Sequence, residues 1–372
     1  MMSRRAKLPA WADIGLIPLI NVLLAFLSAG VVVALIGESP LEAVQVLIRG
    51  AFGYDEGVGY TLYYTTNFIF TGLAVAVAFH AGLFNIGGEG QAYIGGLGVG
   101  LICLALDHLL PWWALLPLAI IAGSLFGAAW AFIPGYLQAY RGSHVVITTI
   151  MFNFIASALM VYLLVNVLIQ PGSMSPETRA IAADSTLPLM HEFFASLGIK
   201  ITQTPLNLSL FVALLACLFV WILIWKTRWG YAIRMIGFNE SAAVYSGINP
   251  KRMVVIAMMI SGSLAGLVAI NEVMGAQERV GLDFVSGAGF TGIAVALMGR
   301  NHPLGIIIAS LLFGALFQGG AELAFEFSTI TRDLVVVIQG LVILFCGALA
   351  YMMRGPLERL FAVVSRSGQG EV

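Results

Sequence analysis

The sequence predicts an all-α polytopic membrane protein with about ten transmembrane helices. Of its 372 residues, 60% are hydrophobic and only 10% are charged, whereas soluble domains carry about 25% charged residues. The mean hydropathy is +0.95. Apolar runs of about 20 residues, the length that crosses a bilayer core, recur along the whole chain.

Ten such runs follow one another in a single predicted transmembrane domain, 1–372. They are 14–36, 61–80, 88–106, 112–138, 144–169, 206–226, 252–274, 285–299, 303–325 and 333–353. The first follows three basic residues, as a signal peptide would. It is longer than an apolar signal core of about 7–15 residues and lacks a small-x-small cleavage site, so a retained span is predicted. The eighth run is short for a span.

The basic residues predict the orientation of these spans. With the N-terminal tail 1–13 in the cytoplasm, 13 of the 18 Lys and Arg fall inside. The five outside are Arg49, Arg179, Lys200, Arg279 and Arg332. This asymmetry follows the positive-inside rule. It predicts a multi-pass protein of the inner (plasma) membrane with both termini, including the tail 354–372, in the cytoplasm.

Two segments are predicted outside the membrane. The connection 170–205 contains four prolines and several polar residues, which indicates an external loop that could face a soluble partner. In 41–52 the apolar residues recur at helical spacing, which favours an interfacial helix over another span.

The stretch HAGLFNIGGEGQAYIGG, 80–96, breaks the apolar pattern between the second and third spans. It contains a cluster of glycines, namely Gly82, Gly87, Gly88 and Gly90. Irregular backbone at membrane depth persists only when it is buried in protein or lines a wet cavity. A carboxylate facing lipid, such as that of Glu89, would cost about 2.5–3.5 kcal/mol. We therefore expect a helix break over 84–91, with Glu89 capping the helix that follows it.

Two interpretations of this break remain open. In the first, Glu89 is a structural cap and Asn85 pairs with backbone groups that the break leaves free. In the second, Asn85, Glu89 and Gln91 border a translocation path and hydrogen-bond a polar solute.

A second break is expected before the eighth span. Phe284 and Gly287 repeat the F-x-x-G spacing of Phe84 and Gly87, five spans apart, and an odd offset suits an inverted repeat. Gly287, Gly289 and Gly292 form G-x-G-x-x-G, but the dinucleotide fingerprint needs a preceding strand and an acidic residue about 20 positions later. Close helix packing is the better explanation, as it is for the pairs Gly123/Gly127 and Gly262/Gly266.

The chemistry expected of an enzyme is absent from the sequence. No P-loop occurs, the five His are scattered, and the three Cys lie far apart in apolar runs, so no cofactor or metal is predicted. A net charge of -1 excludes a nucleic-acid-binding surface. Few charges lie in mid-span, which disfavours an ion-driven carrier. The energy for transport is therefore expected from another protein.

The cytoplasmic segment 226–252 is the longest and most basic of the predicted inside connections. Asn239 is a good N-cap for a short helix through Ser246, and Gly247 would end that helix. Ala242 and Ala243 would give it a small, close-packing face.

Several motifs together resemble a known family. The pattern Gly237-x-Asn239-x-x-Ala242-Ala243-x-x-x-Gly247-Ile248 resembles the coupling segment of ABC importer permeases of the branched-chain amino acid and simple-sugar class. The glycine-rich run 82–91 is similar to another motif of that class. The segments 141–153 and 289–297 resemble its nucleoside (guanosine-type) branch. The resemblance covers most of the chain, and His144 departs from the more polar or acidic residue of many relatives.

The resemblance implies a membrane subunit of an ATP-driven importer, in contact with membrane lipid, that is not itself an enzyme. It implies a partner ATPase, separate or a tandem fusion, a second related permease subunit and an extracytoplasmic solute-binding protein. Nucleosides are the expected solute. Simple sugars or branched-chain amino acids are the alternatives within the class, and an ion-coupled secondary carrier is the alternative outside it.

The resemblance also suggests roles for particular residues. The residues expected to couple to the ATPase are Arg234, Gly237, Asn239, Ala242, Ala243 and Gly247. Those expected at the helix breaks or the translocation path are Asn85, Gly87, Glu89, Gln91, Asn153, Gly287, Gly289 and Thr291. For Asn153, in the fifth span, buried hydrogen bonding between helices is as good an interpretation as a pore position.

Overall fold

The computed structural model describes residues 16–196, 198–331, 333–342 and 344–345. Within these residues the chain is helical, and its one β-type pairing is an isolated bridge between Leu189 and Asn207. The predicted tails 1–13 and 354–372, the end of the tenth predicted span, Arg332 and Cys346 lie outside the described residues.

Seven helices of the described chain are long and apolar enough to cross a membrane. They are α3 (Asp55–His80), α4 (Gly88–Leu106), α5 (Trp112–Arg141), α6 (Val145–Asn166), α8 (Ser209–Lys226), the continuous span Pro250–Ala276 and α14 (Pro303–Glu326). The span Pro250–Ala276 comprises α11 (Pro250–Gly266), α12 (Val268–Asn271) and the π-helix η3 (Glu272–Ala276). Each corresponds to one of the predicted runs.

The other three predicted spans differ from this pattern. The first is α1 (Ile17–Leu35), which forms with α2 (Pro40–Phe52) a pair bent by 119°. The eighth is α13 (Ala288–Met298), whose 11 residues are too few to cross a bilayer at about 1.5 Å per residue. The tenth begins as the apolar helix Asp333–Val342. The count of ten and the orientation in the membrane therefore stay predictions.

The chain divides into two compact units. The first comprises 1–50 and 319–372. In its described part, an added Cβ at Gly50 of α2 would collide with the Glu322 side chain of α14, and one at Gly319 would meet Leu47. The predicted interfacial helix 41–52 is thus found as a helix, α2, packed on α14 in this unit.

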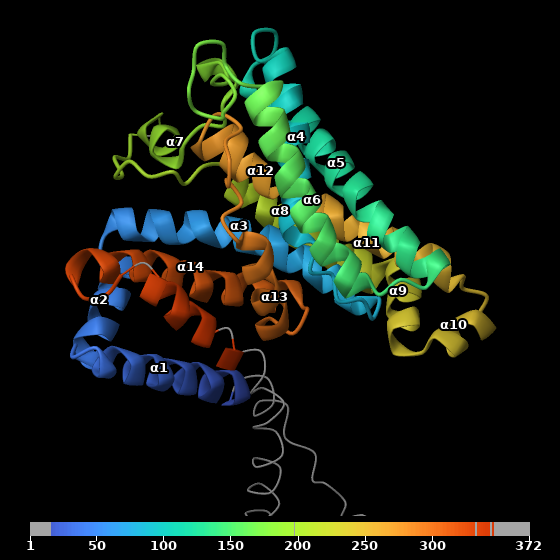
Figure 1. Cartoon of the computed structure of the whole chain (residues 1–372), viewed down its shortest axis with the longest axis horizontal. Helices are drawn as coiled ribbons and strands as arrows, with labels where there is room; N and C mark the ends of the chain where they lie inside the picture. Colours follow the sequence, from blue (N-terminus) through green and yellow to red (C-terminus); the bar gives the residue numbers. More distant parts are fainter. Residues whose placement is uncertain (1–15, 197, 332, 343, 346–372) are drawn as a thin grey trace, which may run out of the picture. The chain divides into compact units, whose positions relative to one another are not determined.

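The second unit, Ala51–Gln318, contains two groups of helices, one mostly buried and one mostly exposed. In an apolar 18-residue window of each span, 78%, 72% and 72% of the residues are buried for α3, α4 and Pro250–Ala276, against 28%, 22% and 28% for α5, α6 and α8. These helices are labelled in Figure 1. The outer helices present apolar surface, and the glycines and polar residues of α3 and α4 are largely confined to the interior. Buried polar groups in such an interior need protein partners.

A glycine contact joins three helices of this unit. Added Cβ atoms at Gly123 and Gly127 of α5 would meet the backbone of Gly266 and Gly262 of α11, and Gly95 of α4 also approaches Gly266. The predicted close packing of the two small-residue pairs is confirmed. Glycine is required here because the backbones approach more closely than any side chain allows.

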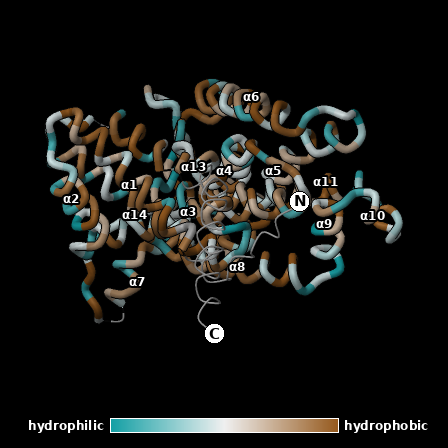
Figure 2. The backbone as a smooth tube through the Cα atoms, turned by 90° about the horizontal axis from the view of Figure 1, so that it is seen from below, coloured by the Kyte–Doolittle hydropathy of each residue, from teal (hydrophilic) through white to brown (hydrophobic). Residues whose placement is uncertain are grey.

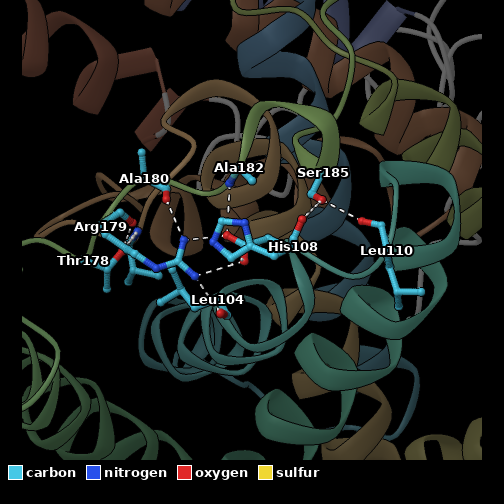
Figure 3. A network of polar contacts seen from close by, with 10 residues as sticks. Leu104, His108, Leu110, Thr178, Arg179, Ala180, Ala182 and Ser185 are labelled. Carbon is cyan, nitrogen blue, oxygen red and sulfur yellow. Dashed lines mark hydrogen bonds and ion pairs between the residues drawn. The ribbon is translucent and has the colours of Figure 1, made fainter.

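The connection 170–205 contains η2 (Ala183–Ser185) and α7 (Met190–Ser196) and is fastened to the helices by an ion pair (Figure 3). Arg179 donates to both carboxylate oxygens of Asp107, at 2.6 and 3.0 Å, and to the carbonyl of Leu104 at 2.8 Å. The Ala182 N–H donates to the same carboxylate at 3.1 Å. The Arg179 guanidinium holds the pKa of the Asp107 carboxyl below its usual 3.8, despite burial, which acts in the opposite direction.

Backbone bonds attach the same loop to η3 and to the segment that follows it. Thr178, Ile181 and Leu187 donate their N–H groups to the carbonyls of Val280, Glu278 and Met274, at 3.0, 2.7 and 2.8 Å. The loop is therefore a fixed surface over this end of the unit rather than a free connection.

The loop and the predicted cytoplasmic segment lie at opposite ends of α5 (Figure 1). The Ser185 hydroxyl donates to the Leu110 carbonyl beside the start of α5, whereas the Lys251 ammonium lies 5.7 Å from the Tyr140 ring at its end. This arrangement agrees with the prediction that the two segments face opposite sides of the membrane.

The ion pair leads to a prediction about the loop. Because the folded-state pKa of Asp107 is lowered, its contribution is present at neutral pH and is lost as the pH falls below about 3.8, through the folded-state value. Asp107→Asn should raise hydrogen–deuterium exchange at Ile181 and Ala182 by about tenfold or more at pH 7. Asp184→Asn, an exposed carboxylate of the same loop, is the control. Equal protection in both variants would contradict the assignment.

Candidate translocation and coupling site

The expected helix break lies between α3 and α4. Gly82, at φ +71°, ends α3, where the Gly82 and Leu83 N–H groups bond to the carbonyls of Phe79 and Ala78. The chain then runs without regular structure to Gly87, the N-cap residue of α4. A break is therefore found, but at 81–87, and residues 88–91 of the predicted break already belong to α4.

Asn85 satisfies the backbone and side chains around the break. Its Oδ1 accepts from the Gly87 N–H at 2.9 Å and from Gln91 Nε2 at 3.1 Å. Its Nδ2 donates to Gln91 Oε1 at 2.9 Å and to the Ser261 hydroxyl at 2.8 Å. Ser261 in turn donates to the Ala74 carbonyl at 2.6 Å. One buried amide therefore links the break to α3, α4 and α11.

Asn153 reaches the same break from α6. Its Oδ1 accepts from the Gly90 N–H at 2.9 Å, and its Nδ2 donates to the Ile86 carbonyl at 3.0 Å. Gly90 must be glycine for this approach, since an added Cβ would lie 2.9 Å from the Asn153 Cα. In this conformation Asn153 makes buried bonds between helix and break, the second of its two sequence-based interpretations.

Glu89 does not cap its own helix, so that part of the prediction is wrong. Its carboxylate crosses to the second break, where Oε1 accepts from the Gly287 N–H at 2.9 Å and Oε2 from the Gly289 N–H at 2.8 Å. Gly287, at φ +78°, is the N-cap residue of α13. Glu89 thus supplies the acceptors and the negative charge that the start of α13 requires.

The two breaks consequently lie side by side. An added Cβ on Gly289 would collide with the backbone of Gly88 and Glu89. Thr291, also buried, donates to the Gly287 carbonyl at 3.3 Å within the first turn of α13. The eight residues predicted at the breaks or the path fall around these contacts.

The predicted coupling segment, 226–252, forms the helices α9 (Arg228–Phe238) and α10 (Glu240–Tyr245). Asn239 caps α10 by accepting from the Ala242 N–H at 3.0 Å, and Gly247 follows at φ +78°. These two expectations are confirmed. Ala243 is fully buried, whereas Ala242 is only partly buried.

Several aromatic or aliphatic side chains of this segment are exposed. Phe238 and Tyr245 are 91% and 93% exposed, and Val244 is 55% exposed. Figure 2 shows hydrophilic and hydrophobic stretches alternating through α9 and α10 at one end of the unit. Beside them, a cleft of about 350 Å³ is lined by Arg228, Trp229 and Arg252, among others. Exposed aromatic residues next to positive charge are typical of a protein interface.

Gly237 connects the coupling segment with the first break. An added Cβ on Gly237 would collide with the His80 carbonyl and approach the Gly82 N–H. His80 Nε2 lies 3.0 Å from the Asn301 carbonyl, in the turn between α13 and α14. The end of α9, the end of α3 and the end of α13 therefore meet. Arg234 lies in α9 with its buried Nε unpaired.

Another polar group was missed in the sequence analysis: the Glu272 cluster, formed by Tyr63, Asn67, Asn271, Glu272 and Gln277. Glu272 accepts from the Tyr63 hydroxyl at 2.6 Å, Asn67 Nδ2 at 2.5 Å and Gln277 Nε2 at 3.1 Å. Asn271 donates to Asn67 Oδ1 at 2.9 Å. The two asparagines inside predicted apolar runs were the signal that could have identified this cluster.

Metal-ligand clusters are absent from the described part of the chain. No group of three or more His, Cys, Asp or Glu there could hold a metal ion. Cys103 and Cys217 are buried free thiols, which agrees with a packing role.

Comparisons of the amino-acid sequence with known proteins identify one family. Residues 57–347 match the family model described as the branched-chain amino acid transport system / permease component. The chain is 35% identical over 346 residues to the guanosine ABC transporter permease protein NupP of Bacillus subtilis (strain 168), covering 93% of this chain and 96% of that protein.

Two further relatives cover the chain to a similar extent. The nucleoside ABC transporter permease protein NupB of Lactococcus lactis subsp. cremoris (strain MG1363) is 34% identical, over 89% of this chain and 90% of NupB. The glucose ABC transporter permease protein TsgB13 of Haloferax volcanii is 33% identical, over 92% of this chain and 90% of TsgB13.

The contact between the two breaks can be tested by adding one methyl group. Gly289→Ala should lower the stability of the purified protein by about 1–3 kcal/mol, because its Cβ overlaps the Glu89 backbone. The midpoint of thermal unfolding measures this effect. Gly340→Ala, where no atom lies within 4 Å of the added Cβ, is the control and should not lower the midpoint, because Ala is the better helix former. Equal midpoints for both variants would disprove the close approach.

Proposed function

The chain belongs to the family of permease components of branched-chain amino acid transport systems, and we propose that it is the membrane subunit of an ABC importer for nucleosides. It is a permease and not an enzyme, and it lies in the inner membrane. The observation that carries the proposal is the coupling segment, which exposes an aromatic surface on α10 and contacts the first helix break through Gly237.

The solute is inferred from the relatives. NupP and NupB are named for guanosine and nucleosides, and both cover about nine-tenths of the chain. The comparable identity of TsgB13, named for glucose, keeps a simple sugar as the rival solute. Both solutes are uncharged and rich in hydroxyl groups. A permease for either needs buried hydrogen-bonding groups rather than a charged pore.

ATP hydrolysis is assigned to a partner ATPase, because the sequence has no P-loop. Its docking surface on this chain is α10 with the end of α9, where Phe238, Val244 and Tyr245 are exposed. Arg228 and Arg252 beside it add positive charge, which favours an acidic patch on the partner. The ATPase is a separate subunit or a tandem fusion of two.

Movement of α10 has a direct structural route to the solute path. The backbone contact of Gly237 with His80 and Gly82 transmits a displacement of α9 to the end of α3. The break that follows is bonded through Asn85 to α11 and through Glu89 to the start of α13. Closure of the ATPase would thus shift both breaks together.

Two further partners complete the proposed importer. A second related permease subunit would form the other half of the membrane assembly. An extracytoplasmic solute-binding protein would dock on the connection 170–205, which is held as a fixed surface by Asp107 and Arg179. A fixed surface loses less conformational entropy on docking than a free loop.

The docking surface gives a test of the proposed function. Phe238→Ala with Tyr245→Ala should lower the amount of ATPase that copurifies with the tagged permease by about tenfold or more, since exposed aromatic residues dominate interface energies. Quantitative mass spectrometry after gentle purification measures it.

The matched control is Phe325→Ala, which removes an aromatic side chain that is 90% exposed on α14. It should leave the copurified ATPase unchanged. If no P-loop ATPase copurifies with the unaltered protein while a known importer keeps its own under the same conditions, the proposed function is wrong.

A further inference from the structure

The Glu272 cluster holds a carboxylate inside a membrane span. Glu272 is 4% exposed and lies in the span Pro250–Ala276. Within the described residues, the three ion pairs all join other groups, so Glu272 is held by the hydrogen bonds of neutral side chains. Carboxylates in such positions are costly and usually mark a path for a solute or an ion.

The backbone at Glu272 is also irregular. Residues Glu272–Ala276 form a π-helix at the end of the span, and the Gln277 N–H donates to the Glu272 carbonyl at 2.8 Å. Such widened turns occur mostly at functional sites, because they cost stability that a purely structural helix would keep. Here the wide turn brings the side chains of Glu272 and Gln277 within 3.1 Å of each other.

The cluster lies at the end of the span that contacts the external loop. Tyr63 and Gln277 are only partly buried, whereas Glu272 and Asn67 behind them are buried. The loop residues Ile181 and Leu187 bond to the backbone of Glu278, just after the π-helix, and of Met274, within it. A solute released at the loop would therefore meet Tyr63 and Gln277 first and Glu272 next.

The cluster has unused hydrogen-bond acceptors, and the side-chain amides of Asn67 and Gln277 each keep one further N–H donor. Oε1 of Glu272 receives two bonds, but Oε2 receives only the one from Gln277. The phenol oxygen of Tyr63 and the side-chain carbonyl of Gln277 add further acceptors. Such a set suits a solute with hydroxyl and N–H groups, whereas a phosphate group would be buried there beside neutral partners, with no cation in the cluster to pair with it.

From these observations we infer that the Glu272 cluster is a solute-binding site of the permease for uncharged molecules rich in hydrogen-bond donors. Building on the proposed function, the solute is a nucleoside without a phosphate group. Glu272 accepts from its hydroxyl or N–H groups, and Tyr63 and Gln277 lie at the opening.

The site is tested by photo-crosslinking with 4-thiouridine in membrane vesicles that contain the assembled transporter. Mass spectrometry should find the crosslinks within 60–67 or 272–280. Excess uridine should prevent them, and uridine 5′-monophosphate should not. Glu272→Gln keeps the shape of the side chain and one acceptor oxygen, and should lower the yield about tenfold, as expected for a lost bond to a charged group.

The matched control is Glu278→Gln, a partly buried carboxylate six positions further along the chain, whose yield should stay within about twofold of the unaltered protein. Equal thermal unfolding midpoints exclude a folding defect in either variant. Crosslinks elsewhere, an unchanged yield in Glu272→Gln, or protection by the monophosphate equal to that by uridine would overturn the site. Uridine uptake, measured separately in the same vesicles, tests the proposed function, so the two failures are distinguishable.

Discussion

The centre of this fold depends on one constraint, the pair of hydrogen bonds that the N–H groups of Gly287 and Gly289 donate to the Glu89 carboxylate. It joins residues 198 and 200 positions apart at the point where two helices are interrupted. Free backbone groups cannot remain in a membrane interior. At each break, a side chain from another element bonds to the free backbone groups. Glu89 accepts from the N–H groups at the start of α13, and Asn153 donates to the carbonyl of Ile86.

Glycine makes these bonds geometrically possible and extends them toward the coupling segment. Gly88 and Gly289 let the two breaks approach, and Gly82 and Gly237 let the end of α9 approach the end of α3. The same close backbone contacts that stabilise the fold therefore leave little room for relative movement between α10 and α13. In the proposed importer, this tight packing transmits movement of the ATPase to both breaks.

Much of this arrangement could be predicted from local sequence patterns. Features that depend on a few neighbouring residues were found where they were expected. They are the glycines around Gly87, the cap at Asn239 and the small pairs Gly123/Gly127 and Gly262/Gly266. The partner of Glu89 could not be predicted, because a cap normally serves its own helix and no sequence signal points to α13. The Glu272 cluster was missed because Asn67 and Asn271 meet only in three dimensions.

The most direct test of the central claim is the amount of solute imported per ATP hydrolysed by the complex reconstituted in liposomes, with and without Glu89→Gln. The amide keeps one acceptor and places a donor against the other N–H group, so the two breaks lose part of their connection while α10 stays intact. The account predicts continued ATP hydrolysis with import per ATP lowered by about tenfold or more. An unchanged ratio in a stably folded variant would contradict it.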